Sequence, residues 1–136
     1  MTIQLQKSDS GHYRQTIRVH QLSSQHTIYA DVATALGGDD SAPDPHDLFD
    51  AALAACKAIT LMMYATRKQL KLDWVDIEIL RDVSQEAQGE YRLEVALSLI
   101  GDLSDPEKQQ LLAIADRCPI HKLITTSTVH VNTYLK

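Results

Sequence analysis

The chain has 136 residues, with 13 Lys and Arg against 18 Asp and Glu, and its formal net charge at pH 7 is −5. This length and a hydrophobic content of 44% are typical of one compact domain over residues 1–136. Binding to nucleic acid or to an anionic membrane needs clustered Lys and Arg, which the sequence lacks, so we expect neither among the partners.

No segment predicts export or membrane insertion. The first ten residues lack the apolar run of a signal peptide. The longest nearly uncharged stretch, residues 51–65, is interrupted by Lys57 and is shorter than the ~18–20 residues that span a bilayer. We therefore expect a cytoplasmic protein. A permanent disulfide between Cys56 and Cys118 is not expected there, so the two thiols are either small buried side chains or a transient redox pair.

The first predicted elements are two strands and a loop. Apolar and polar side chains alternate over residues 12–20, which predicts a half-buried strand, and residues 27–30 are its expected hairpin partner. Residues 37–45 are rich in Gly, Asp and Pro, which indicates a loop.

A long helix is predicted from about residue 45 to residue 69. Asp44 is the expected N-cap, Pro45 the first helical residue, and Asp47 the N3 residue whose carboxylate favours the positive end of the helix dipole. Several alanines near Cys56 would let another backbone approach closely, and Lys57 is expected to be solvated. The helical spacing predicts that one face is buried, formed by Leu48, Ala52, Cys56, Ile59, Met63 and Leu70.

The second half of the chain predicts three more strands and two helices. Residues 74–81 and 91–100 alternate like antiparallel strands joined by a polar loop. Ser104 and Glu107 have the spacing of a capping box, which starts a second helix. Pro119 interrupts that helix, a short helix follows to residue 124, and residues 127–135 alternate like a last strand. The apolar face of the second helix is expected to consist of Leu111, Leu112 and Ala115.

This order of elements predicts an α+β fold with a mostly antiparallel sheet. The long helix is expected to cover one face of the sheet. Because only 5% of the residues are aromatic, we expect a second copy of the chain to cover the remaining apolar surface.

The two cysteines are the candidate reactive groups. A nearby cation would favour the nucleophilic thiolate of Cys56, whereas burial alone would disfavour it. Cys118 directly precedes Pro119, and backbone N–H groups at the start of the following helix would favour a thiolate there. His121 would lie on the same side of that turn, although a solvated histidine is the alternative.

The sequence Asp44-Pro-His-Asp-Leu-Phe-Asp-Ala-Ala-Leu-Ala-Ala-Cys56, followed later by Arg117-Cys-Pro-Ile-His121, resembles the OsmC/Ohr family of thiol-dependent peroxide reductases. The resemblance extends over nearly the whole chain. It implies a mostly antiparallel sheet wrapped around a long central helix. It also implies an intertwined homodimer with each active site at the subunit interface.

The resemblance implies a two-cysteine cycle without a cofactor. Cys56 would attack the O–O bond of an organic hydroperoxide and become a sulfenic acid. Cys118 would resolve the sulfenic acid as a disulfide, and an external dithiol such as a lipoylated protein would reduce the disulfide.

The chain departs from the family pattern at the expected charged partners of the thiolate. Family enzymes hold an Arg near the thiolate with a Glu ten positions before the cysteine, where this chain has His46 with Asp47 beside it. A shift of one residue turns a side chain by ~100° on a helix, which makes Asp47 a poor substitute. Arg14 and Arg18 are the arginines that precede Cys56, and either is a candidate cation.

Two other functions are compatible with the sequence, and a group of apolar residues is the expected pocket for an apolar peroxide. A non-catalytic dimer that binds a small ligand or a persulfide is one alternative, because the expected Glu is missing. A zinc site is the other, with His46, Cys56, Cys118 and His121 as ligands. The candidate pocket residues are Leu48, Phe49, Leu53, Met63 and His121.

Overall fold

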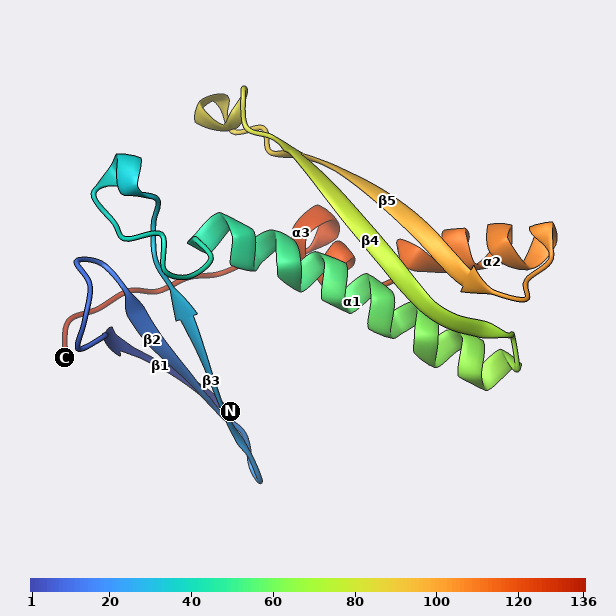
Figure 1. Ribbon diagram of the computed structural model, residues 1–136, viewed down its shortest axis with the longest axis horizontal. Coiled ribbons are helices and arrows are strands. Elements are labelled where there is room, and N and C mark those ends of the chain that lie inside the picture. The colour runs from blue at the N-terminus through green and yellow to red at the C-terminus, as the bar shows by residue number, and fades with distance from the viewer. The chain divides into compact units, whose positions relative to one another are not determined.

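The computed structural model describes all residues, 1–136, and shows a mixed α+β chain with antiparallel sheets (Figure 1). It divides into two compact units, residues 1–51 and 52–136, which are described separately, and the expectation of a single domain stays a prediction. The elements in chain order are β1 (Thr2–Lys7), β2 (Gln15–His20), β3 (Gln25–Ala30), the 3-10 helix η1 (Thr34–Leu36), α1 (Pro45–Lys68), β4 (Leu72–Asp82), the 3-10 helix η2 (Glu86–Gln88), β5 (Arg92–Gly101), α2 (Asp105–Ala115) and α3 (Pro119–Thr126).

The first unit contains a three-stranded antiparallel sheet in the order β1-β2-β3. Ile17 in the central strand lies opposite Leu5 of β1 and Ile28 of β3. The strands β2 and β3 confirm the predicted hairpin. Strand β1 was not predicted. Ile3 and Leu5 alternate with polar side chains along it, but all six of its residues are exposed.

Two aspartates fix the start of α1. The Asp44 carboxylate accepts a hydrogen bond from the backbone N–H of Asp47 (2.8 Å), and the Asp47 carboxylate accepts one from the backbone N–H of Asp44 (3.1 Å). This reciprocal pair satisfies two N–H groups that the helix itself cannot pair. The helix begins at Pro45 as predicted, and it ends at Lys68, before Gln69 adopts a left-handed conformation with φ 57°.

The predicted buried face of α1 is wrong for the single chain. Ile59 and Met63 are 59% and 61% exposed, whereas Leu53 and Leu61 are 3% and 0% exposed. The helix is apolar on two sides, so the spacing of apolar residues fits either face. The face that is buried carries Lys57, a charged residue that the apolar pattern assigned to solvent.

The second unit has one hydrophobic core, to which α1, α2 and the β4–β5 ribbon contribute. Its buried centre consists of Leu61, Ala65, Leu72, Leu111 and Ala115. Alternate residues of β4 and β5, among them Val75, Leu97 and Leu99, pack against this centre, while the residues between them are exposed. In Figure 1 the ribbon crosses α1 within this unit. The core therefore holds the C-terminal half of α1 against α2.

The two predicted helices after β5 are both present. The Ser104 side chain accepts from the backbone N–H of Glu107, and the Glu107 carboxylate accepts from the backbone N–H of Ser104 (2.8 Å), which confirms the capping box. Leu112 is 52% exposed, so its predicted place on the buried face is wrong. Successive residues of a helix are rotated by ~100°, so Leu112 points away from the core that its neighbour Leu111 enters.

The predicted strand over residues 127–135 is wrong. Residues 127–136 form no strand, and Val129 and Val131 are 63% and 83% exposed. Alternation of side chains alone does not make a strand, because a strand needs a neighbour with which to exchange backbone hydrogen bonds. Residues 127–136 belong to neither of the two sheets.

Candidate functional site

The two cysteines, far apart in the sequence, meet in the second unit. Cys56 lies on α1 and is partly exposed, whereas Cys118 is fully buried at the start of α3. Both are free thiols, and they lie close enough for the Cys56 side chain to raise the pKa of the Cys118 thiol. An accessible thiol thus lies beside a secluded one, which is an arrangement suited to formation of a disulfide.

Cys118 is the N-cap of α3. Its sulfur accepts a hydrogen bond from the backbone N–H of His121 (3.3 Å), as the Cys-Pro sequence predicted. Burial nevertheless raises the pKa of the Cys118 thiol, and the hydrogen bond and charge of Cys56 raise it further. The His121 N–H and the positive charge of Lys57 offset part of this increase. The resting Cys118 is therefore a protonated thiol at neutral pH.

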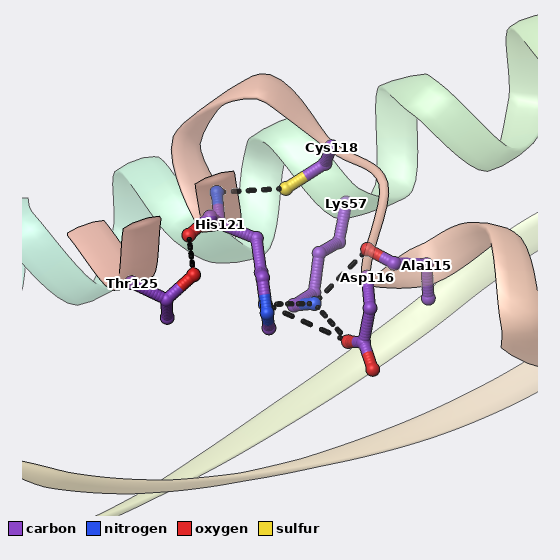
Figure 2. Close-up of polar contacts among 6 residues, drawn as sticks. All are labelled: Lys57, Ala115, Asp116, Cys118, His121 and Thr125. Carbon is purple, nitrogen blue, oxygen red and sulfur yellow. Dashed lines mark hydrogen bonds and ion pairs between the residues drawn. The ribbon is translucent and has the colours of Figure 1, made fainter. Parts of the chain in front are cut away.

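Lys57, the residue after Cys56, lies beside this pair and is only 2% exposed. Its ammonium group donates to the Ala115 carbonyl (3.0 Å), to the Asp116 carboxylate (2.9 Å) and to Nδ1 of His121 (3.1 Å), as Figure 2 shows. The expectation that Lys57 is solvated is thus wrong. Its side chain is buried, and acceptors for all three ammonium protons come from the last residue of α2, the residue after it and the third residue of α3.

The charges in this cluster influence one another. The hydrogen bond and the positive charge of Lys57 lower the pKa of the Asp116 carboxyl. An ammonium group can only donate hydrogen bonds, so Nδ1 of His121 must accept, and this assigns the ring proton to Nε2. His121 is thus a partly buried member of the cluster rather than a solvated side chain.

The candidate cation Arg14 lies in the first unit, just before β2. Its guanidinium group donates to the backbone carbonyl (2.8 Å) and to the hydroxyl (2.9 Å) of Ser41, and it lies 4.3 Å above the centre of the Tyr29 ring. Arg18 is partly buried on β2, opposite Gln4 and Thr27. The catalytic roles expected for these arginines stay predictions.

The remaining predicted site residues lie along α1. Asp47 completes the helix cap, and His46 is exposed in the first turn. Phe49 is 44% exposed and Leu48 is partly buried. Leu53 belongs to the buried face and Met63 to the exposed one, so a substrate pocket formed by all of these residues stays a prediction.

No group of three or more His, Cys, Asp and Glu side chains is arranged to hold a metal ion. The four proposed zinc ligands, His46, Cys56, Cys118 and His121, are therefore not assembled as a site in this chain. Cys118 and His121 take part instead in the hydrogen bonds described above.

Asp31 stabilises the loop that contains Ser41, and we expect its contribution to the free energy of unfolding to depend on pH. It is buried, and hydrogen bonds from the Ser41 hydroxyl (2.6 Å) and the Val32 N–H (2.9 Å) lower its pKa to about 2. Because the folded state holds the ionised form more strongly than the unfolded state does, Asp31 contributes stability above pH ~4, and this contribution is lost as the pH falls to about 2.

We expect the Asp31→Asn variant to be less stable than the wild type at pH 7. The difference in the free energy of unfolding should shrink as the pH falls through this window. Urea unfolding at a series of pH values measures it. A difference that stays constant with pH would contradict the assignment of the stabilising hydrogen bonds to the ionised carboxylate.

Known structures and families agree with this fold. Residues 38–133 match the family model described as "OsmC-like protein". An osmotic stress induced and detoxification response protein from Psychrobacter arcticus is 20% identical, with 93% of this chain and 89% of that chain covered and a TM-score of 0.75. No curated protein matches the sequence significantly.

Two similar structures are organic hydroperoxide resistance proteins. The OsmC protein of Legionella pneumophila is 22% identical over 93% of this chain and 90% of that chain, with a TM-score of 0.63. OhrB of Bacillus subtilis is also 22% identical, over 93% and 92% of the two chains, with a TM-score of 0.56. These likenesses show a shared fold. With the family match over most of the sequence, they establish that this chain belongs to the OsmC/Ohr family of OsmC-like proteins.

Proposed function

We propose that the protein reduces organic hydroperoxides through Cys56 and Cys118. The observation that carries this proposal is that a partly exposed thiol, Cys56, lies close to a buried one, Cys118. The family, and two relatives named for organic hydroperoxide resistance, support the choice of substrate.

The proposed cycle has three steps. The Cys56 thiolate attacks the O–O bond, an S–O bond forms, and the departing alkoxide takes up a proton to become an alcohol. Cys118 then attacks the sulfenic sulfur of Cys56, an S–S bond forms, and the hydroxyl group leaves as water. An external dithiol reduces this disulfide by two exchange reactions and is itself oxidised, and a lipoylated protein is the proposed donor.

Mass spectrometry after one equivalent of cumene hydroperoxide tests the proposal. We expect one internal disulfide per chain, located by peptide mapping between Cys56 and Cys118, with the wild type consuming one peroxide. A fully reduced, unmodified pair would refute the peroxidase and favour the alternative, a dimer that binds a small ligand or persulfide.

We also propose that the protein is a homodimer in which the exposed face of α1 is covered. Ile59 and Met63 lie one helical turn apart and are both more than half exposed, with the small Ala52 and Ala55 exposed on the preceding turns. Symmetric pairing of such a face with its copy would remove this apolar surface from water.

The Met63→Glu variant tests the dimer. A carboxylate at this position would be buried without a partner, so we expect the variant to be a monomer at concentrations where the wild type is a dimer. Light scattering coupled to size-exclusion chromatography measures the mass. Lys68→Glu at the exposed end of the helix is the charge control and should remain dimeric, and a monomeric wild type would contradict the proposal.

We propose a soluble, cytoplasmic location. The helix α1 is long and apolar enough to cross a membrane by length and composition alone, with a mean hydropathy of 1.5 in its most apolar 18 residues, although residues 51–65 by themselves are shorter than a membrane span. Buried core helices of soluble proteins share this length and composition. The ion pair that Lys57 forms with Asp116 agrees with a core helix, because it ties α1 to a neighbouring segment of the protein.

A further inference from the structure

We propose that Lys57 is a positioning residue that holds Cys118 against Cys56 and thereby sets the rate of disulfide formation. The inference rests on the proposed function, because it concerns the second step of that cycle. It assigns a role to a side chain that the two-cysteine chemistry itself does not use.

The geometry links the two thiols through one side chain. Lys57 follows Cys56 directly on α1, and its ammonium group binds the last residue of α2, its C-cap Asp116 and the third residue of α3. Cys118 lies between these anchor points, two residues after Asp116 and three before His121. The Lys57 side chain, held by three hydrogen bonds, therefore connects the helix that carries Cys56 to the segment that carries Cys118 (Figure 2).

His121 links the Lys57 ammonium group to the sulfur of Cys118 by two hydrogen bonds. The ring of His121 accepts from Lys57, and the backbone N–H of the same residue donates to the Cys118 sulfur. A displacement of His121 would thus move the donor that orients the thiol. Reaction between two positioned groups is sensitive to such displacements, and a shift of ~1 Å can slow it by about a hundredfold.

The energetics favour a positioning role over a purely stabilising one. Burying an ammonium group costs free energy, and a well-packed apolar side chain at such a place is often as stable or more so. Asp116, the anionic partner, is 72% exposed, so water would satisfy its carboxylate after the loss of Lys57. We therefore expect Lys57→Met to fold, while the segment that carries Cys118 loses its anchor.

A chromogenic aromatic disulfide measures the step without any peroxide. In excess reagent the accessible Cys56 reacts first and releases one chromophore, and Cys118 then attacks the mixed disulfide and releases a second. The S–S bond between the cysteines forms as the bond to the chromophore breaks. The ratio of the second rate to the first reports how well Cys118 is positioned, and Cys56→Ser should abolish the first release.

For Lys57→Met we expect this ratio to fall by about tenfold. Lys122→Met, which removes the same charge from an exposed position on α3, is the matched control and should keep the wild-type ratio. A wild-type ratio in Lys57→Met would overturn the proposal. Asp116→Ala retains the buried lysine but removes one of its three acceptors, so we expect the ratio to fall by about threefold. This variant keeps the test decisive if Lys57→Met does not fold.

The pH profile separates positioning from a general loss of structure. The groups that face Cys118 are Cys56 and Lys57 from α1 and the His121 N–H from α3. The second release requires the Cys118 thiolate, so its rate rises with pH. Because the positive charge of Lys57 lowers the pKa of Cys118, the midpoint of this rise should move to higher pH in Lys57→Met and stay unchanged in Lys122→Met. An unchanged midpoint in Lys57→Met would contradict the placement of the Lys57 ammonium group beside Cys118, on which the proposal depends.

The proposal and the proposed function fail in different ways. If the protein formed no disulfide with hydroperoxide but Lys57→Met slowed the second release, the peroxidase would be refuted and the positioning role supported. If hydroperoxide produced the disulfide equally fast in Lys57→Met and the wild type, the positioning role would be refuted and the peroxidase supported.

Discussion

Replacing Cys56 by serine is expected to lower the peroxidase turnover by about a thousandfold or more, because a serine hydroxyl is not ionised near neutral pH and cannot take the place of a thiolate as nucleophile. The assay follows consumption of cumene hydroperoxide with dihydrolipoamide as the dithiol. Cys56 is the thiol that peroxide can reach, since it is partly exposed whereas Cys118 is fully buried.

The Cys118→Ser variant is the matched control for this prediction. It should still react with one equivalent of peroxide, because its accessible thiol is intact, but the sulfenic acid should persist and be trapped by dimedone. The wild type should yield little trapped adduct, since Cys118 competes with the reagent. Wild-type turnover in Cys56→Ser would exclude the proposed mechanism. Wild-type turnover in Cys118→Ser, together with its loss in Cys56→Ser, would show that the resolving cysteine is dispensable.

The largest effect on stability is expected for Leu111→Ala, which should lower the free energy of unfolding by about 3 kcal/mol. Leu111 is 0% exposed and lies in the core cluster with Leu61 and Ala115. Truncating a leucine in a closely packed core removes apolar contacts and leaves a cavity that its neighbours fill only in part.

Leu112→Ala is the control for Leu111→Ala, because it makes the same chemical change one residue further along α2. Leu112 is 52% exposed, so the loss should stay below about 1 kcal/mol. Urea unfolding of both variants at the same protein concentration measures the difference. Equal losses would contradict the assignment of the core to one face of α2.

Local interactions in the sequence predicted the boundaries of the elements well. The caps at Asp44 and Ser104 and the α3 start at Pro119 depend on residues within three positions of one another, and all three are confirmed. The alternation likewise identified β2, β3, β4 and β5, four of the five strands that have partners within the chain, but not β1. Residues 127–135 show the limit of this signal, because their alternation is just as regular and no ladder forms.

In the candidate site, too, the local features were predicted correctly and the tertiary ones were not. The sequence named both cysteines by their motifs and placed Cys118 at a helix start, because these are local features. It misjudged the buried face of α1 and the environment of Lys57, because a helix that is apolar on two sides does not specify which side meets the core.

The sequence by itself thus determined the three α-helices, four of the five strands, the helix caps and the identity of the two candidate thiols, since each depends on neighbours along the chain. Only the tertiary structure decided that Cys56 meets Cys118 and that Lys57 is buried between α1 and the segment joining α2 to α3. The acceptors for the Lys57 ammonium group lie about sixty residues away in the sequence, and burial of a lysine becomes favourable only when folding brings them together.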